Sequence, residues 1–363
     1  MPQQTIIFTV FNDLTYDQRM MRICGSLSTH YDVLLVGRSF KSSKVPAEMP
    51  YRQKRLPSWF RKGKLAYIEY NLRLFIFLLF QPANAICAID LDTIFPCYIV
   101  TGLKKIPRIY DAHELFCEMK EIVERPAIYK FWKWIERNTV PHFRYGYTVN
   151  EILAAEFRKL YSVQYRVIRN LPILKELNPV HKKGDYILYQ GAVNEGRSFE
   201  TLIPAMQWVD HTLIICGNGN FMSKARALVE EYRLEEKVIF KGLILPSELW
   251  QYTQNAAIGI TLFDRIGDNN YYSLANRFFD YIQAGIPQLC VDYPVYRQIN
   301  EQYRVALLVD DLSAENLASS LNNLLRNDVL YHELQENSFK ARTMFHWQNE
   351  EKYLLDFYKQ ILK

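Results

Sequence analysis

The sequence contains little that would anchor the chain in a membrane or hold it together with covalent or metal cross-links. Its six cysteines lie far apart and form no Cys-x-x-Cys pair, which argues against a zinc cluster and fits a reducing compartment. The longest apolar run, residues 74–80, is far shorter than the roughly 20 residues of a spanning helix. The first residues lack the basic stretch and apolar run of a signal peptide. We therefore expect a cytoplasmic protein.

Two further absences narrow the function. No Gly-x-Gly-x-x-Gly joins a first strand to its helix, which disfavours a dehydrogenase. The net charge of +5 is too small for a dedicated nucleic-acid binder, so we expect no nucleic acid among the partners.

The excess positive charge is concentrated between residues 52 and 64. Trp59 and Phe60 lie there among the basic residues Arg52, Lys54, Arg55, Arg61, Lys62 and Lys64. Basic residues beside exposed aromatic ones can hold a protein on anionic lipid headgroups. Peripheral contact with an anionic membrane, at the inner face of the cytoplasmic membrane, is therefore one interpretation. The other is a solvated loop that closes over the following helix.

Short apolar segments alternate with longer amphipathic ones along the chain. Residues 5–10, 33–36, 85–89 and 108–110 have the pattern of strands, and residues 17–28, 64–80 and 93–104 have that of helices. Such alternation predicts a parallel sheet covered by helices.

The alternation breaks at Asn170-Leu171-Pro172. A polar stretch with Pro179 and Gly184 follows, and a second strand–helix series begins at residue 186. A chain of 363 residues is long enough for two such domains. We predict an α/β fold of two doubly wound, Rossmann-like domains facing a cleft, at residues 1–172 and 173–345. The last helix, about 346–363, is expected to pack back on the first domain.

The most informative segment is residues 271–287, which predicts a polar turn followed by a helix that ends at Gly285. Ser273 to Asn276 would lie at the helix N-terminus, where unsatisfied amides and partial positive charge favour a phosphate. Asp280 shares a helix face with Asn276, and its carboxylate could accept two hydrogen bonds from ribose hydroxyls. A capping asparagine and a surface aspartate would explain the same residues.

Two glycine-containing segments also predict loops that follow strands. In residues 189–202, Gly191 and a second glycine allow a close approach to a pyrophosphate, and Arg197 could clamp it. In residues 215–220 a strand is followed by a glycine turn at Gly217, a weak signal because such turns are common for steric reasons.

The first half offers two candidate groups. Asp111, His113 and Glu114 follow a strand at residues 108–110, although a lone histidine is more often structural. Asp17 and Arg19 open the helix that follows the first strand, where an aspartate can serve simply as a partner of the helix dipole.

Taken together, these segments resemble the GT-B-fold glycosyltransferases, specifically the retaining family-4 group of bacterial surface polysaccharide synthesis. The resemblance spans nearly the whole chain. The residues that carry it are residues 12–19 (Asn-Asp-Leu-x-x-Asp-Gln-Arg), 110–114 (Tyr-Asp-Ala-His-Glu), 189–197, 216–219, 238–242 and 273–280.

The resemblance implies a nucleoside diphosphate sugar donor, a glycan or lipid-linked acceptor, and retention of the anomeric configuration. It implies no metal or other cofactor, since Asp90-Leu-Asp92 lies away from the expected donor site. His113 and Asp280 are the catalytic residues that it implies. The remaining site residues that it implies are Gly191, Arg197, Gly217, Gly242, Ser273, Asn276 and Arg277 for the donor, and Asn12, Asp13, Asp17, Arg19 and Glu114 on the acceptor side.

The chain departs from the family pattern at two places. Tyr272 stands where the first of two glutamates is usual, and only the second carboxylate, Asp280, is present. Ala192 lies near the place of a phosphate-loop arginine, and Arg197 stands where a lysine would be. The loss of the first glutamate leaves open a non-catalytic nucleotide-binding partner of another transferase. A sugar-nucleotide epimerase of the same fold is a second alternative, because it could use the same cleft and donor.

Overall fold

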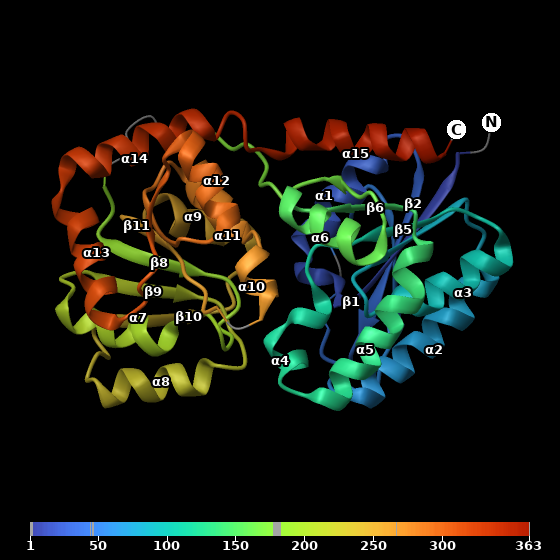
Figure 1. The fold of residues 1–363 in the computed structure, drawn as a ribbon, viewed down its shortest axis with the longest axis horizontal. Coiled ribbons are helices and arrows are strands. Elements are labelled where there is room, and N and C mark those ends of the chain that lie inside the picture. Colours follow the sequence, from blue (N-terminus) through green and yellow to red (C-terminus); the bar gives the residue numbers. More distant parts are fainter. Residues whose placement is uncertain (1–2, 44, 46, 177–182, 266, 363) are drawn as a thin grey trace. The chain divides into compact units, whose positions relative to one another are not determined.

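The structure, a computed structural model, describes residues 3–43, 45, 47–176, 183–265 and 267–362. It divides into two compact units (Figure 1). Unit 1 comprises the chain up to Asn170 together with the segment from Glu350 onward, and unit 2 comprises Leu171–Asn349. The sequence placed these boundaries at 172/173 and 345/346. Pro179, which was part of the argument for a boundary, lies outside the described residues.

Unit 1 is built on a parallel sheet. Among the described residues the sheet has seven strands, in the order β3-β2-β1-β4-β5-β6-β7. The strands are β1 (Thr5–Asp13), β2 (Asp32–Ser39), β3 (Arg52–Pro57), β4 (Ala85–Ile89), β5 (Arg108–Asp111), β6 (Tyr145–Thr148) and β7 (Arg166–Val167). The helices are α1 (Gln18–Leu27), α2 (Lys64–Phe80), α3 (Ile94–Lys104), α4 (Lys120–Val123), α5 (Pro126–Thr139), α6 (Glu151–Tyr161) and α15 (Trp347–Ile361).

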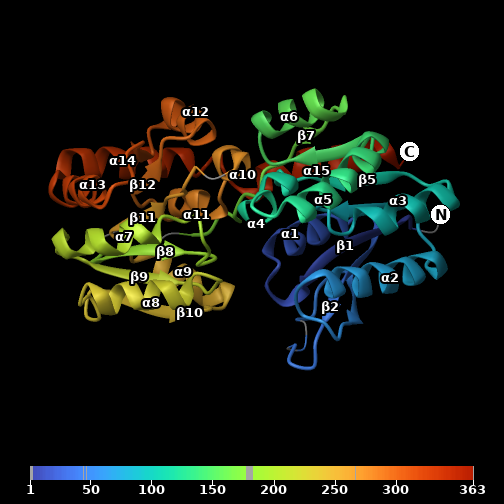
Figure 2. The same cartoon turned by 60° about the horizontal axis from the view of Figure 1, so that its bottom comes forward.

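The central strand β4 of unit 1 is apolar throughout because helices cover the sheet. All five residues of β4 are buried, as expected for a strand in a doubly wound sheet. Helices α2, α3 and α5 form one layer (Figure 2). Helix α15 fits the aromatic core of the unit, where the Tyr358 ring lies 5.8 Å from that of Phe8 and the Phe357 ring 5.3 Å from that of Tyr147.

The basic segment 52–64 is not the single loop considered from the sequence. Its first half is the edge strand β3, whose backbone pairs with β2. Two of its arginines are also bound to carboxylates, Arg52 to Asp32 and Arg55 to Asp13. Exposed basic residues on an edge strand discourage pairing with another chain, which gives Lys54 a structural role of its own.

Unit 2 repeats the architecture. Among the described residues its parallel sheet has six strands, in the order β10-β9-β8-β11-β12-β13. The strands are β8 (Tyr186–Gln190), β9 (Thr212–Cys216), β10 (Val238–Gly242), β11 (Ile258–Thr261), β12 (Gln288–Val291) and β13 (Ala306–Val309). The helices are α7 (Phe199–Ala205), α8 (Met222–Glu231), α9 (Pro246–Gln254), α10 (Asp268–Tyr272), α11 (Asn276–Ala284), α12 (Pro294–Tyr303), α13 (Ala314–Arg326) and α14 (Asp328–Ala341).

Helix α11 ends where the sequence predicted. Gly285 has a φ of +68°, the left-handed conformation that terminates a helix, and a Cβ there would overlap the Phe339 ring. The helix is strongly one-sided, with Phe278, Phe279 and Ile282 in the core of unit 2. The polar residues at its N-terminus are thereby fixed at the edge of the sheet.

The fold class is confirmed: both units are Rossmann-like, with parallel strands and covering helices. In the described part of the chain, no helix combines the length and the apolar character that crossing a bilayer requires.

Candidate functional site

Both sheets reverse their strand order at one point, between β1 and β4 in unit 1 and between β8 and β11 in unit 2. In open parallel sheets, ligands bind beyond the carboxyl ends of the strands at such a point. The sequence-predicted residues lie at these edges.

In unit 2 the loops after β8 and β9 lie in close contact, which explains why glycine occupies positions 191 and 217. The backbone nitrogen of Gly191 donates to Cys216 O (3.0 Å), and that of Val193 donates to Asn218 O (3.1 Å). A Cβ on Gly217 would lie 1.7 Å from Gly191 O, so any side chain there would force the loops apart. Gly242, at the end of the edge strand β10, pairs with Cys216 and has a φ of +70°.

Two arginines converge beside this loop pair. Arg197 and Arg277 both lie over the Phe263 ring, at 4.4 and 4.5 Å from its centroid. A Cβ on Gly191 would lie 3.4 Å from Arg277 Nη1, so the guanidinium borders the glycine loop. Two positive charges gathered at a glycine loop and near the start of α11 form an environment that favours an anion.

The arginines are held by residues that the sequence analysis missed. Arg277 Nη1 donates to the Tyr189 hydroxyl (3.3 Å), and Arg197 Nη1 donates to Asn270 Oδ1 (3.0 Å). The Asn270 amide in turn donates to Gly196 O and Asp264 O. Asn270 therefore fixes the glycine loop and its arginine together, through a contact between segments more than 70 residues apart that no local pattern reveals.

Asp280 lies one turn into α11 and is held by a buried network. Gln190 Nε2 donates to Asp280 Oδ2 (2.8 Å), and Thr253 Oγ1 donates to Gln190 Oε1 (2.8 Å). Burial lowers the pKa of the Lys175 ammonium, and the nearby Asp280 carboxylate opposes that shift. Gln190 and Lys175 are further neighbours of the site that the sequence analysis missed.

The turn before α11 differs in detail from the prediction. Asn276 is the first helical residue, whereas Ser273 lies in the short link after α10, where its hydroxyl donates to Asn270 O (3.1 Å). The amide of the capping residue Ala275 donates to the buried Tyr296 hydroxyl (3.0 Å). Tyr272, at the place of the family's first glutamate, closes α10 and packs on Tyr271.

In unit 1, side chains between the end of β1 and the start of α1 form hydrogen bonds with one another and with the edge strand β3. Asp17 caps α1 by accepting from Met20 N (3.0 Å), and the Asn12 amide donates to Asp17 (3.3 Å). Asp13 accepts from Thr15, Ser43 and Arg55. Burial raises the pKa of Asp13, but the hydrogen bonds from Ser43 and Thr15 outweigh that effect and lower it overall.

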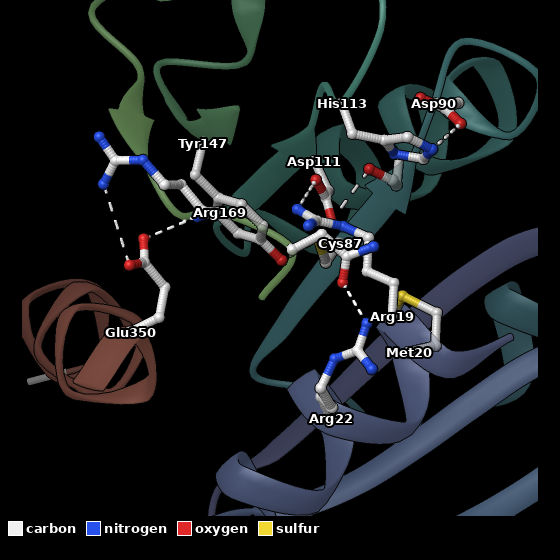
Figure 3. Close-up of polar contacts among 12 residues, drawn as sticks. Arg19, Met20, Arg22, Cys87, Asp90, Asp111, His113, Tyr147, Arg169 and Glu350 are labelled. Carbon is white, nitrogen blue, oxygen red and sulfur yellow. Dashed lines mark hydrogen bonds and ion pairs between the residues drawn. The ribbon is translucent and has the colours of Figure 1, made fainter. Parts of the chain in front are cut away.

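Arg19 forms a buried ion pair that the sequence analysis did not predict. Its Nε and Nη2 donate to the two carboxylate oxygens of Asp111, at 3.0 and 2.6 Å (Figure 3). Both side chains are more than nine-tenths buried. The pair fixes the start of α1 to the end of β5, beside the loop that carries His113.

His113 faces an aspartate of the neighbouring strand end. Its Nε2 lies 3.0 Å from Asp90 Oδ2 (Figure 3). Burial, and next the negative charges of Glu114, Asp92 and Asp111, raise the pKa of Asp90. Burial, and next Glu114, likewise raise the pKa of Asp92. The edge of unit 1 at His113 is therefore rich in carboxyl groups.

The structure thus assembles two groups of predicted residues. Within unit 2, the Gly191–Gly217 loops, both arginines and Asp280 share one edge of the sheet. Within unit 1, His113 and Glu114 lie with Asp90 and the Arg19–Asp111 pair. Asn12 and Asp13 are the last residues of β1, and not part of the loop expected from the sequence, and Asp17 caps α1.

Comparisons with known proteins agree with this architecture. Residues 173–341, which lie within unit 2, match the family described as Glycosyl transferases group 1. No curated protein matches the sequence.

Several solved structures are similar over almost their whole length. A sucrose-phosphate synthase from Thermosynechococcus elongatus superposes with a TM-score of 0.83 at 16% identity, over 99% of both chains. The Anabaena protein Alr3699/HepE, in complex with UDP and glucose, has a TM-score of 0.76 at 11% identity, over 98% of this chain and 99% of that one.

WaaG, a glycosyltransferase involved in lipopolysaccharide biosynthesis, has a TM-score of 0.74 at 15% identity, over 97% of this chain and 99% of that one. At such identities the likeness establishes the GT-B fold. The match to Glycosyl transferases group 1 covers residues 173–341, nearly all of unit 2, and supports a glycosyltransferase.

Proposed function

We propose that the protein transfers a sugar from a nucleoside diphosphate sugar to a glycan or lipid-linked acceptor in the synthesis of a cell-surface polysaccharide, with retention of the anomeric configuration. The observation that carries the proposal is the pair Arg197 and Arg277 over Phe263, beside the Gly191 loop. A diphosphate is the part of such a donor that needs two fixed positive charges.

The other predicted residues take their roles around this diphosphate. Asp280, held by Gln190, would accept hydrogen bonds from the ribose hydroxyls. Gly217 and Gly242 border the site where the base would lie. His113 would meet the donor sugar at the reacting centre, and Asn12, Asp13, Asp17, Arg19 and Glu114 would act on the acceptor side, by contact or by supporting the loops there.

Transfer would proceed without a metal ion. As the bond to the diphosphate breaks, negative charge grows on the leaving group. Arg197, Arg277 and the positive end of the α11 dipole would stabilise that charge in place of a cation. The acceptor hydroxyl would attack on the same face as the departing diphosphate. The diphosphate would then take the proton of that hydroxyl.

The direct test combines binding and turnover. Thermal shifts with UDP, GDP, ADP, dTDP and CMP, with and without EDTA, would identify the donor base, because a ligand that binds only the folded state raises the melting temperature. UDP and UDP-glucose are the first probes, since HepE is a structural neighbour with both. Release of UDP from UDP-glucose and the anomeric proton coupling of the product then report transfer and its stereochemistry.

The proposal makes a sharp distinction among arginine variants. Arg197→Met and Arg277→Met should each abolish most of the thermal shift, whereas Arg326→Met, at an exposed ion pair of the same unit, should leave it unchanged. A nucleotide shift that survives both site variants, or that EDTA removes, would contradict the proposed donor site.

We also propose that unit 1 rests on an anionic membrane. Helix α2 is strongly apolar apart from Glu69, Asn71 and Arg73 in its middle, and only one side, with Tyr70 and Leu74, is buried in the unit. Its opposite side is a continuous apolar stripe, each residue of which is at least half exposed: Leu65, Ile68, Leu72, Ile76 and Phe80. A contiguous exposed apolar surface of this kind marks an interaction site.

The segment before α2 continues this surface and adds charge. Trp59 is 79% exposed, yet its backbone is fixed, because Glu69 accepts hydrogen bonds from Trp59 N and Phe60 N (3.0 and 3.1 Å). Around it Arg61, Lys62 and Lys64 are exposed. An apolar stripe flanked by basic residues fits the headgroup boundary of an anionic bilayer, where each basic residue adds about 1 kcal/mol.

Flotation with vesicles tests this surface. Binding to phosphatidylcholine vesicles that contain 30% phosphatidylglycerol is expected, with much weaker binding to phosphatidylcholine alone or in 0.5 M salt. The double variant Leu72→Glu/Ile76→Glu should lose binding, and Val329→Glu, at a more exposed apolar position in unit 2, should not. Equal flotation of all three proteins would overturn the assignment.

A further inference from the structure

Asp90 and His113 meet because their strands are neighbours. Asp90 directly follows β4, and His113 lies two residues beyond β5, which pairs with β4 at Ile89↔Asp111. Between the two side chains, His113 Nε2 lies 3.0 Å from Asp90 Oδ2. The contact joins residues 23 positions apart in the sequence, and no role has yet been given to Asp90.

The backbone of Asp90 is held in an uncommon conformation. Its φ is +56°, in the left-handed region that few residues other than glycine adopt. Its N–H donates to Asp111 O (3.1 Å), so the backbone of the Arg19–Asp111 pair fixes this turn. Such conformations gather at functional sites, where the surrounding structure enforces them.

The charge around Asp90 is mostly negative. Glu114 and Asp92 lie nearby, as does Asp111, and the Arg19 guanidinium of α1 is the positive group that opposes them. Burial and these neighbours disfavour a second negative charge, so the raised pKa of Asp90 is a consequence of its position. The His113 ring beside it can share its proton.

The position of the proton between Asp90 and His113 determines which nitrogen of the His113 ring is protonated. A neutral imidazole carries its proton on one nitrogen only. An ionised Asp90 holds the proton on Nε2 and leaves Nδ1 as an acceptor, whereas a protonated Asp90 donates to Nε2 and moves the ring proton to Nδ1. Within the described residues, His113 Nδ1 has no hydrogen-bond partner, so Asp90 is the side chain that sets this choice.

We propose that Asp90 is a positioning residue that fixes the ring orientation and the protonated nitrogen of His113. The proposal rests on the proposed function, in which His113 meets the donor sugar. Asp90 itself touches no reacting atom. Its effect belongs to the sugar-transfer step and not to nucleotide binding, which depends on unit 2.

The charge can be removed without disturbing the fold. Asparagine tolerates the left-handed conformation, so Asp90→Asn keeps the backbone of the turn. We expect kcat to fall about 10- to 100-fold, with an unchanged KM for the donor, the effect typical of groups that orient a functional histidine. Asp90→Glu should recover part of the loss, and Asp356→Asn, at an exposed carboxylate of the same unit, should have none.

The pH dependence of kcat distinguishes a positioning role of Asp90 from a general loss of stability. Burial raises the pKa of the Asp90 carboxyl, and removing this group should shift or abolish one limb of the wild-type kcat profile. A variant that is merely destabilised would lower kcat by the same factor at every pH. A parallel, unshifted profile would overturn the proposal.

A second measurement does not need turnover. In protein labelled with ¹⁵N-histidine, the ring nitrogens of His113 are identified by the signals lost in His113→Ala. Asp90→Asn should move these signals between the patterns of the two ring tautomers and leave those of the other histidines in place. If no sugar is transferred by the wild type, the proposed function fails, and the NMR result still decides the pairing. Unchanged His113 signals in Asp90→Asn would refute the pairing of Asp90 with His113.

Discussion

The two units share one topology but carry opposite chemistry at the same edge. Both sheets reverse their order after the first strand and place loops at the resulting switch point. In unit 2 that edge gathers two arginines on an aromatic ring between glycine loops. In unit 1 it gathers Asp90, Asp92 and Glu114, and its arginine, Arg19, is already bound to Asp111.

The difference shows how a repeated scaffold divides two tasks. Strand order determines where a ligand can lie, and side chains at that place determine its charge. Fixed cations suit a diphosphate, whereas carboxyl groups suit the hydroxyls of a sugar or glycan. The two edges can therefore be tested separately, because a change in one should leave the chemistry of the other intact.

The largest effect is expected from the cationic edge. Arg277→Met keeps most of the side-chain volume between Tyr189 and Phe263 but removes the charge. Losing one preorganised charge at a leaving group costs about 2.7–4 kcal/mol of transition-state stabilisation, which corresponds to a 100- to 1,000-fold loss of kcat/KM. Steady-state kinetics measures this loss, with Arg326→Met as the control. A loss below fivefold would mean that the diphosphate lies elsewhere.

His113→Ala should give the next largest effect, and it probes the opposite edge. Loss of a positioned proton-transfer or polar group at a reacting centre lowers kcat by roughly 100-fold or more. Nucleotide binding should be unaffected, because the binding groups lie in unit 2. UDP thermal shifts and kcat, measured on the same protein samples, separate the two outcomes. A weakened UDP shift would show that the edges are not independent.

Asp280→Asn should have a moderate effect on the donor. Hydrogen bonds to a charged group contribute about 1.5–3 kcal/mol each, so affinity for the donor should fall roughly 10- to 100-fold. The Gln190 side chain can rotate to bond the new amide, so stability should change little. Titration calorimetry with UDP measures the loss. A deoxyribose analogue of the nucleotide should show a smaller difference between variant and wild type.

Gly217→Ala sharpens the comparison of the loops. The added Cβ would overlap Gly191 O, and forcing such groups apart typically costs 1–3 kcal/mol, so the free energy of unfolding should fall by about that amount and UDP binding should weaken. Gly25→Ala is the matched control, since nothing lies within 4 Å of a Cβ there and alanine favours helix α1 by roughly 0.5–1 kcal/mol. Urea denaturation of both variants measures the contrast.

The smallest expected effect is a pH dependence confined to unit 1. A carboxyl whose pKa is raised by folding binds more protons in the folded than in the unfolded state, so its contribution lowers stability as pH rises above the unfolded value near 4. Asp92 faces Glu114, Asp90 and, in opposition, Arg38. Asp92→Asn should therefore raise the melting temperature by a few degrees at pH 8 and have little effect at pH 4. A shift of equal size at both pH values would exclude this cause.

Much of the fold could be predicted from the sequence. The bounds of α2 and β4 agree with those predicted, because their apolar runs end at clear polar signals. Helix α12 and strand β13 were not predicted, and β13 has only four residues, two of them partly exposed. Strand β3 was taken for part of a loop, because an edge strand with basic residues has the composition of one.

For the candidate site, local sequence patterns predicted individual residues but not the residues that they contact. The glycines and Arg197 follow strands, and the Gly285 stop fixed the register of Asp280 on its helix. The contacts of Asp280 with Gln190, of Arg197 with Asn270 and of His113 with Asp90 arise from strand order. That order is set by long-range packing, which one sequence does not display.

Unit 1 is completed only by the last helix, and this affects how the chain can be made. The rings of Phe357 and Tyr358 fill the core against Tyr147, while Ser26 donates to Glu351. During synthesis, unit 2 emerges uninterrupted and can fold at once, whereas unit 1 waits with an open aromatic core until α15 leaves the ribosome. Unit 1 is therefore synthesised first but completes its core last. A fragment that ends at Asn170 should aggregate, whereas residues 171–349 should fold alone.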